Sequence, residues 1–275
     1  MNKAWFRVIF ALVLLASIPF FAGCPLDASS AKKDDLYLAD KAFDERDIGD
    51  AEMYFERYLR KNPEGEDRWD VWLQLLAISL DIRQDKSTAA EYLEIMLREY
   101  TDDTSKRRLI QKHLADLYKD IHAYPRATVL WEALASDPDL ISEERAVVYR
   151  ELSHAYLRRL EFTAAIDVLD LCLQLDVRPD TKVDCFYALA ETQMLTYKLA
   201  ESEKALRELL SIEGASPDRR VLATFFLADV LEQREKWKEA MELFESIRET
   251  YPNAKVIEVR LGALKNKLSG KGTKK

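Results

Sequence analysis

Residues 149–172 read YRELSHAYLRRLEFTAAIDVLDLC, and this stretch contains the pattern that decides the fold. Before a charged turn at residues 158–161, apolar and small side chains recur at intervals of three and four: Tyr149, Leu152, Ser153 and Tyr156. After the turn, the same spacing continues with Ala165, Leu169 and Cys172. Such spacing places each set on one face of a helix. Because the small residues Ser153 and Ala165 allow close approach while larger side chains fill the groove, the stretch predicts two antiparallel helices packed together.

This hairpin recurs along the chain with a fixed period. Small residues mark the second helix of each copy, at steps of 38, 38, 38, 37 and 38 residues: Ala51, Ala89, Ala127, Ala165, Ser202 and Ala240. On the first helix, a leucine followed by a small residue keeps the same step, as in Leu114-Ala115 and Leu227-Ala228. A repeat of this length is typical of solenoids, in which each helix pair buries its open apolar face against its neighbours. We therefore expect an all-α solenoid of about six helix-turn-helix repeats.

Proline and capping signals set the expected boundaries of the repeats. Dipeptides such as Asn62-Pro63 and Asp137-Pro138 mark the ends of second helices. We expect helix pairs over residues 32–63, 70–101, 107–137, 143–176, 182–213 and 218–251, which form a repeat region over 32–252. A Lys-rich capping helix over 253–268 and a disordered basic tail over 269–275 complete the chain. Among second helices, Asp50 is the expected cap of one, and Thr88 with Glu91 has capping-box spacing at another.

The repeated residues resemble the tetratricopeptide-repeat (TPR) pattern, Trp-x-x-Leu-Gly-x-x-Tyr, then Ala-x-x-x-Phe, then Pro. The third repeat contributes Leu114-Ala115, Tyr118, Ala127 and Trp131, and the sixth contributes Leu227-Ala228, Ala240, Phe244 and Pro252. The resemblance covers residues 32–252, although the period is longer than the usual 34 residues. It implies a TPR-like α-solenoid whose first helices line a concave surface that binds protein partners.

The first 24 residues differ in kind from the rest of the chain. Lys3 and Arg7 precede an apolar run over residues 8–21. This run is shorter than the roughly 20 residues of a membrane span and has the layout of a secretory signal. Residues 21–24, FAGC, resemble the bacterial lipobox, which implies cleavage after residue 23 and a diacylglyceryl group on Cys24. We expect a lipoprotein signal peptide over 1–23 and a lipidated cysteine with a short tether over 24–31; an ordinary cleaved signal and an uncleaved anchor are the alternatives.

The expected compartment follows from these residues. In enteric bacteria an Asp directly after the lipidated cysteine favours inner-membrane retention, and Pro25 occupies that place here. We therefore expect an outer-membrane anchor facing the periplasm, with inner-membrane anchoring as the alternative. Export makes the compartment oxidising, so Cys172 and Cys185 either form a disulfide or remain two buried thiols. They lie on helices expected to run antiparallel, which allows them to face each other.

Composition and motifs argue against several functional classes. The net charge is −8 and the isoelectric point is near 5.2, unlike the basic character of a nucleic-acid binder. The three histidines are scattered over different repeats, and no glycine-rich phosphate loop, paired Cys-x-x-Cys or nucleophile elbow occurs. We expect no enzymatic activity, cofactor, metal site, small-molecule substrate or nucleic-acid partner.

The register of the repeats also points to residues that face the concave surface. The position three before each small residue of the first helix is occupied by Leu36, Gln74, Lys112, Arg150, Tyr187 and Phe225. One turn further along, His154 joins this surface. One interpretation is a peptide groove in which Lys112 and Arg150 hold a carboxylate while Tyr187 and Phe225 accept apolar side chains. The other is that these are ordinary solvated or packing positions.

An exported, lipid-anchored TPR array is similar to several families of Gram-negative envelope lipoproteins. These are the BamD type, which serves outer-membrane β-barrel assembly, the pilotin type of secretin and pilus systems, and lipoproteins that organise peptidoglycan synthesis or hydrolysis. The BamD-type likeness rests on the lipobox and on Phe244 with the following 249–253, ETYPN. The resemblance implies a membrane-anchored scaffold or adaptor for a protein or peptide partner. A permanent structural subunit that uses its convex face or its ends is the alternative.

Overall fold

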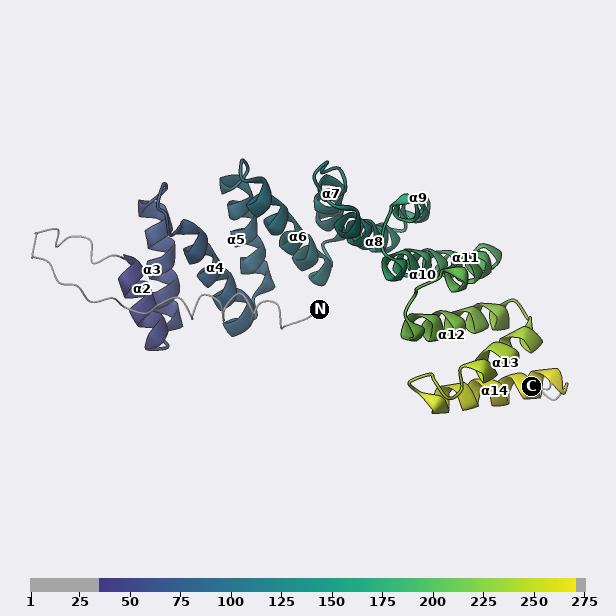
Figure 1. Ribbon diagram of the computed structural model, residues 1–275. Coiled ribbons are helices and arrows are strands. Elements are labelled where there is room, and N and C mark those ends of the chain that lie inside the picture. Colours follow the sequence, from purple (N-terminus) through teal and green to yellow (C-terminus); the bar gives the residue numbers. More distant parts are fainter. Residues whose placement is uncertain (1–34, 271–275) are drawn as a thin grey trace, which may run out of the picture. The chain divides into compact units, whose positions relative to one another are not determined.

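A computed structural model describes residues 35–270 of the chain (Figure 1). The expected signal peptide over 1–23, the lipidation site Cys24, the tether over 24–31 and residues 271–275 of the expected tail lie outside the described residues. The described part contains thirteen α-helices, one π-helix and no β-strand. It divides into two compact units, residues 35–71 and 72–270, and the boundary falls within one helix.

The helices follow one another in pairs, and we call the first helix of each pair the A helix and the second the B helix. Residues 35–71 contain α2 (Asp35–Asp44), α3 (Ile48–Lys61) and the start of α4 (Arg68–Ala77). The second unit continues α4 through η1 (Ile78–Ile82) and then contains α5 (Lys86–Glu99), α6 (Thr104–Asp120), α7 (Tyr124–Ala135), α8 (Ser142–Arg158), α9 (Phe162–Gln174), α10 (Pro179–Leu195), α11 (Leu199–Ser211), α12 (Pro217–Gln233), α13 (Trp237–Ser246) and α14 (Ala254–Leu268). The expected all-α solenoid of six helix pairs followed by a terminal helix is therefore confirmed.

The two capping expectations are wrong. The cap of α3 is Asp47, which accepts the amide of Asp50, and the cap of α5 is Asp85, which accepts the amides of Ser87 and Thr88. The cause is that each B helix begins three residues before the small residue that marks its contact, so Asp50 and Thr88 lie inside the first turn. The A helix of the second repeat ends in the π-helical turn η1. Ser269 and Gly270, expected in the tail, form the turn that closes α14.

Each A helix is joined to its B helix by the same turn. Its central residue has positive φ in all six repeats: Arg46, Gln84, His122, Leu160, Tyr197 and Glu235. In the sixth repeat the amide of Glu235 donates to the carbonyl of Glu232 and that of Lys236 to the carbonyl of Leu231, which is the Schellman arrangement. Glycine usually occupies this left-handed position. The turn therefore has a defined geometry without its usual residue.

A second recurring device closes the loops between repeats. A basic side chain near the start of an A helix donates to carbonyls at the end of the preceding B helix: Arg68, Arg107, Arg145, Lys182 and Arg220. Arg145, for example, reaches the carbonyls of Asp137 and Leu140 at 2.7 and 3.0 Å. Other acceptors, such as the carbonyls of Leu59 and Leu210, lie in the last helical turn, where they lack helical partners and carry the negative end of the helix dipole. These five cations therefore have a structural role.

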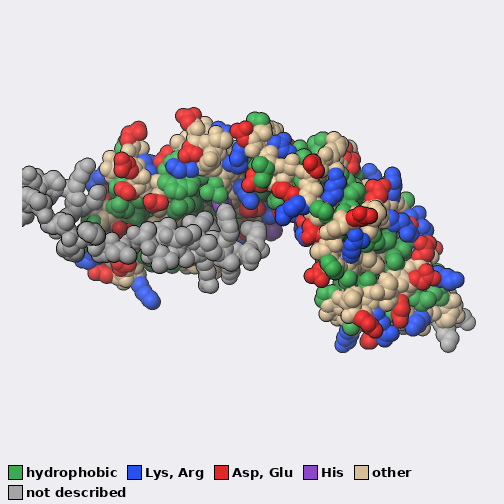
Figure 2. Space-filling model, in the orientation of Figure 1, with side chains coloured by type: hydrophobic (Ala, Val, Ile, Leu, Met, Phe, Trp, Pro, Cys, Tyr) green, Lys and Arg blue, Asp and Glu red, His purple; other side chains and the backbone are tan. Residues whose placement is uncertain are grey.

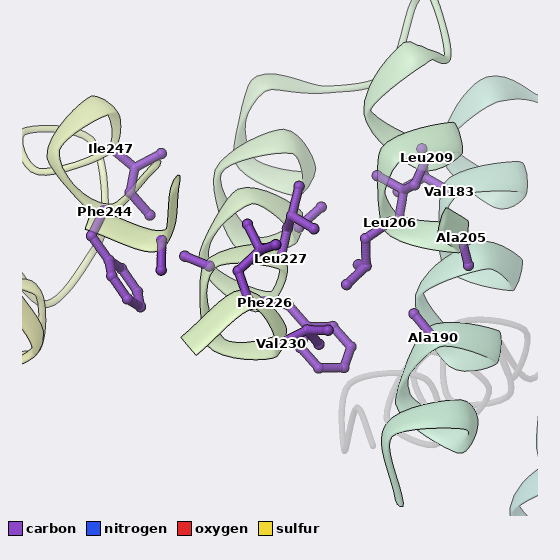
Figure 3. Packing of buried hydrophobic residues seen from close by; sticks show 14 of the residues in the cluster. Val183, Ala190, Ala205, Leu206, Leu209, Phe226, Leu227, Val230, Phe244 and Ile247 are labelled. Carbon is purple, nitrogen blue, oxygen red and sulfur yellow. The ribbon is translucent and has the colours of Figure 1, made fainter. Parts of the chain in front are cut away.

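The largest part of the core lies between the helices of the C-terminal repeats. In repeats five and six, Leu206 and Leu209 of α11 project towards Leu227 and Val230 of α12, and Phe244 of α13 completes the layer (Figure 3). Burying an aliphatic or aromatic side chain of this size stabilises a fold by about 1.5–3 kcal/mol. The small residues of the period, including Ala190 and Ala240, are fully buried at the helix contacts. The small residues that recur at a fixed step in the sequence therefore lie where helices pack against each other.

The two remaining cysteines are bonded to each other. Cys172 on α9 and Cys185 on α10 form a disulfide, and both are fully buried. Together with Ala146 they make a small core cluster between the fourth and fifth repeats. Of the two alternatives left by the sequence, the structure contains the bonded one.

Candidate functional site

The A helices of the second unit provide the candidate interaction surface. Neighbouring A helices contact each other directly, α8 with α10 and α10 with α12, while among the described residues successive B helices show no comparable contact. The repeats of this unit are therefore closest together on the A-helix side. We call the exposed side of α6, α8, α10 and α12 the A face. The expected groove residues Lys112, Arg150, Tyr187 and Phe225 occupy equivalent positions on these four helices.

Ion pairs connect the A helices to each other. Lys119 of α6 contacts Glu151 of α8 at 2.6 Å, and Arg150 of α8 contacts Asp184 of α10 at 2.6 Å. Asp184 also receives Arg219 of α12 at 2.8 Å. We call these contacts the A-helix ladder. Because its groups are half-buried and joined in a network, the ladder is stronger than isolated surface pairs, which contribute about 0–1 kcal/mol each.

The ladder changes the role of one expected groove residue. The guanidinium of Arg150 is already occupied by Asp184, so a ligand carboxylate would have to compete with a bonded partner. Lys112, by contrast, is exposed on α6, and no ion pair involving it occurs within the described part of the chain. His154, one turn after Arg150, is also exposed. Of the expected polar groove residues, Lys112 and His154 therefore remain exposed to a partner, whereas Arg150 is already paired.

The expected aromatic residues lie at the other end of the A face and are engaged in packing. Phe225 stacks on Tyr251 with ring centroids 4.5 Å apart, and its edge meets Phe244 at 5.4 Å. Tyr187 lies against Phe226 at 5.1 Å. Burial raises the pKa of Tyr187, and the charge of Glu191 raises it further. The structure thus assembles Tyr187 and Phe225 into one half-buried aromatic cluster with Tyr251, which leaves part of each ring available to a partner.

The polar groups near Lys112 are electrostatically coupled. Burial lowers the pKa of His113, while the charge of Asp116 opposes this and that of Lys112 adds to it. Burial raises the pKa of the Asp116 carboxyl despite the nearby Lys119, and the charge of Glu151 also raises it. Perturbed groups of this kind accompany catalytic sites as well as structural ion pairs. Here the hydrogen bond from Lys119 to Asp116 and its contact with Glu151 identify them as part of the ladder.

Three further features of the described residues concern metal ligands, membrane-spanning helices and surface charge. Within residues 35–270, no cluster of three or more His, Cys, Asp or Glu side chains is arranged to hold a metal ion. In the same part of the chain, none of the helices combines the length and the apolar character needed to cross a bilayer. Basic and acidic side chains are interspersed over the visible surface (Figure 2). The arrangement is suited to holding a polypeptide by charge and aromatic contacts.

Sequence reasoning missed the partner of Arg150 and the five loop-closing cations. Asp184 lies 34 residues after Arg150, and nothing in the local sequence connects the two. The loop-closing cations did carry a signal, since Arg107, Arg145, Lys182 and Arg220 each lie seven residues before the leucine of the repeated pair. This recurring position therefore identifies, from the sequence alone, cations that close the loops and are not available to a partner.

Comparison with known proteins gives the class of fold. No family model matches the chain, and no curated protein matches it. Among solved structures, a putative kinesin light chain from Podosopora anserina with nearly identical TPR-like repeats aligns with a TM-score of 0.54 and 18% identity, covering 74% of this chain and 98% of its own. PilW, described as a widely conserved type IV pilus biogenesis factor, aligns with 0.53 and 15% identity over 85% of this chain and all of its own. YrrB, a TPR protein with an unusual peptide-binding site, aligns with 0.51 and 13% identity over 77% and 97%.

These likenesses, all at low identity, show the fold alone. The chain is a TPR-like α-solenoid, as the repeat pattern predicted. They do not distinguish among the types of envelope lipoprotein that the sequence resembles.

Proposed function

We propose that this protein is a non-enzymatic interaction scaffold that holds a protein or peptide partner on its A face. The observation that carries the proposal is that some A-face side chains are paired with each other while others remain exposed to a partner. Arg150 and Asp184 are occupied in the A-helix ladder, whereas Lys112 and His154 are exposed and the rings of Tyr187 and Phe225 remain half-exposed. A rigid, internally paired surface that still presents cations and aromatic rings is suited to recognising an extended segment.

The chemistry of the face specifies the kind of segment. The exposed ammonium of Lys112 on α6 favours an acidic group, and a charge-assisted contact of this type is among the stronger polar ones. Aromatic rings at the α10–α12 end favour apolar side chains. The partner segment on this proposal is therefore acidic at one end and apolar at the other.

The cellular setting is part of the proposal. We infer that Cys24 carries a lipid and that the protein is anchored in a bacterial membrane, most simply the outer membrane facing the periplasm. The support is the sequence of residues 1–24. Assembly of outer-membrane, pilus or secretin, or peptidoglycan machinery is the functional context. The fold shared with PilW is compatible with a role in such an assembly but does not single it out.

A permanent structural role remains the second candidate, and one observation favours it. Val129 on the B helix α7 and Val259 on the terminal helix α14 are apolar and well exposed, at 63% and 64%. An obligate subunit would bury such side chains against its neighbours in a complex. This candidate uses the B helices and the end of the array, so the two proposals predict different contact surfaces.

Purification from membranes tests the proposal. Full-length protein is extracted with detergent, alongside Lys112→Glu and a control with the same charge change on the B helix α11, Lys204→Glu. The proposal predicts that the A-face variant loses its copurifying partner while the control retains it. Retention in both would contradict an A-face partner. Separately, lipid labelling that persists in Cys24→Ala would contradict the anchor.

A further inference from the structure

One edge of the second unit exposes apolar side chains at the tips of its turns. The turns between α8 and α9 and between α10 and α11 present Leu160, Phe162, Leu195 and Tyr197 to solvent. Leu160 is 72% exposed and Tyr197 is 88% exposed. Isolated exposed apolar residues are ordinary, but four on two successive turns form a group that calls for a physical reason.

Two of these residues occupy the central, left-handed position that all six A-to-B turns share. Leu160 and Tyr197 have φ values of 63° and 58°, in the left-handed region where glycine is the usual residue. A leucine or tyrosine there is disfavoured by its own backbone and, being exposed, gains little from packing. The other turns have the same backbone conformation with polar residues such as Arg46, Gln84 and Glu235, so the turn does not require an apolar side chain. The fold therefore does not account for these two side chains.

The turns lie along the same edge of the unit. Because A and B helices alternate in direction, every A-to-B turn is on one edge and every B-to-A loop is on the opposite edge. Contacts between repeats agree with this arrangement: Lys86 pairs with Asp120 across two consecutive A-to-B turns, and Lys236 pairs with Glu203 across the last two. On the other edge, Glu143 accepts the amide of Arg178. We call the first edge the turn edge and the second the loop edge.

The two edges differ in charge. In the turn edge, residues 119–126, 157–162, 195–200 and 233–238 contain eight Lys and Arg against three Asp and Glu. In the loop edge, residues 100–104, 136–144, 174–180, 211–218 and 249–253 contain one Arg against eleven Asp and Glu, and the loop-closing Arg107, Arg145, Lys182 and Arg220, which donate to backbone carbonyls, border these segments. Five of the eight turn-edge cations are paired internally: Lys119, Arg126, Arg159, Arg234 and Lys236. Arg158, Lys198 and Lys238 are exposed, and the described residues form no ion pair with them. A chain with net charge −8 therefore carries one basic, apolar-tipped edge.

We propose that the turn edge is a docking surface for an anionic phospholipid membrane. The apolar tips at Leu160 and Tyr197 would enter the headgroup–acyl boundary, and exposed cations such as Arg158 and Lys198 would pair with lipid phosphates. Tyrosine is suited to this boundary, since its ring is apolar and its hydroxyl remains hydrated. The acidic loop edge then faces away from the membrane. A protein partner would fit the apolar tips as well, but the charge asymmetry favours the lipid surface.

This docking does not depend on the proposed A-face partner or on a lipid at Cys24. If an anchor is present, it fixes one end of the chain at the membrane, and the turn edge fixes the orientation of the array. The A face then stands at a defined angle to the bilayer. Failure of the edge proposal leaves the A-face proposal intact, because the two involve different side chains and different readouts.

Site-specific photo-crosslinking tests the proposal with the full-length chain on vesicles. Tyr197 is replaced by p-benzoylphenylalanine, and Ile141 of the loop edge, which is 61% exposed, is replaced in the same way as the matched control. On vesicles of phosphatidylcholine and phosphatidylglycerol in equal parts, we expect several-fold more lipid adduct at 197 than at 141. On phosphatidylcholine alone, this excess should be lost. Any tether to the vesicle is common to both proteins, so it cancels in the comparison.

A second variant tests whether the exposed cations of the turn edge are needed for the lipid contact. In Arg158→Gln/Lys198→Gln carrying the probe at 197, the lipid adduct should fall several-fold while the circular dichroism and thermal unfolding stay unchanged. Equal lipid adducts at 197 and 141 would overturn the proposal. So would a lipid adduct that is insensitive to vesicle charge, or a protein adduct in place of lipid when the same probe is used in cells.

Discussion

Cys172 of α9 and Cys185 of α10 are joined by a disulfide, with their Cα atoms 5.9 Å apart, so a covalent bond crosses the boundary between the fourth and fifth repeats. In a solenoid each repeat is held only by its neighbours, and such a boundary is otherwise maintained by noncovalent packing. The bond closes a short segment that includes the loop between the two helices. It therefore fixes the spacing of α8, α9 and α10, on which Arg150 and Asp184 depend for their contact.

Breaking this bond should weaken the array. We expect Cys172→Ala/Cys185→Ala to lower the free energy of unfolding by about 3 kcal/mol, since a bridge over a segment of this length restricts the unfolded chain by roughly that amount. Denaturant titration with and without reductant measures the effect. Reductant should destabilise the wild type and leave the double variant unchanged. Equal stability of all four samples would mean that packing alone holds the boundary.

The left-handed turn residues offer a test of backbone strain. Glu235 has a φ of 61° and an exposed side chain. We expect Glu235→Gly to be about 1 kcal/mol more stable than Glu235→Ala, because alanine retains the left-handed penalty that glycine lacks. Thermal unfolding of the two variants gives the comparison. If alanine proved the more stable, the turn would not have the geometry described above.

Glu203 provides a pH-dependent prediction. Its carboxylate is 7% exposed and contacts Arg207, Arg234 and Lys236. Burial raises the pKa of Glu203, but hydrogen bonds from Lys236 and Arg207 and the charges of Arg234 and Lys236 outweigh it, so the pKa lies below its ordinary value of 4.5. A lowered pKa means that the stabilisation is complete above pH 4.5 and is lost as the pH falls through the folded-state value.

The variant Glu203→Gln should therefore be less stable than the wild type at neutral pH, by about 1–3 kcal/mol, the contribution typical of hydrogen bonds to a charged group. The difference should shrink as the pH is lowered below 4.5. Urea unfolding of both proteins between neutral and acidic pH measures it. A difference that stays constant over this range would show that the ion pairs do not stabilise the fold.

Packing and binding roles on the A face can be separated. Phe225→Ala should cost about 2 kcal/mol of stability, less than a fully buried phenylalanine, because its ring is stacked on Tyr251 but half-exposed. Leu222→Ala, at an exposed position of the same helix, is the matched control and should cost much less. Lys112→Ala should change stability by no more than about 0.5 kcal/mol, as for surface residues in general. A large loss for Lys112→Ala would mean that this lysine supports the fold.

The repeat pattern was sufficient to predict the fold because each helix contact requires a small residue at a fixed place. Ala165 and its counterparts keep their step as a result, and the pattern is readable without any contact map. The turn residues keep the same step, but Leu160, Tyr197 and Glu235 share no chemical character, so their common backbone could not be predicted.

The candidate site was only partly predictable for a similar reason. Spacing places Arg150 on the A face, but its engagement by Asp184 depends on how two repeats lie against each other. Phe225 likewise owes its half-burial to Tyr251, which belongs to the loop after α13. Register assigns a residue to a face, while its availability to a partner is decided by its neighbours in the next repeat.

The central claim is that a partner binds the A face, and photo-crosslinking in cells tests it most directly. A photoreactive residue at Lys112 is compared with one at Val129, which is 63% exposed on the B helix α7 of the same repeat. The account predicts a discrete protein adduct from position 112 that is absent from position 129. Adducts from 129 together with none from 112 would contradict it and would place the partner on the B helices.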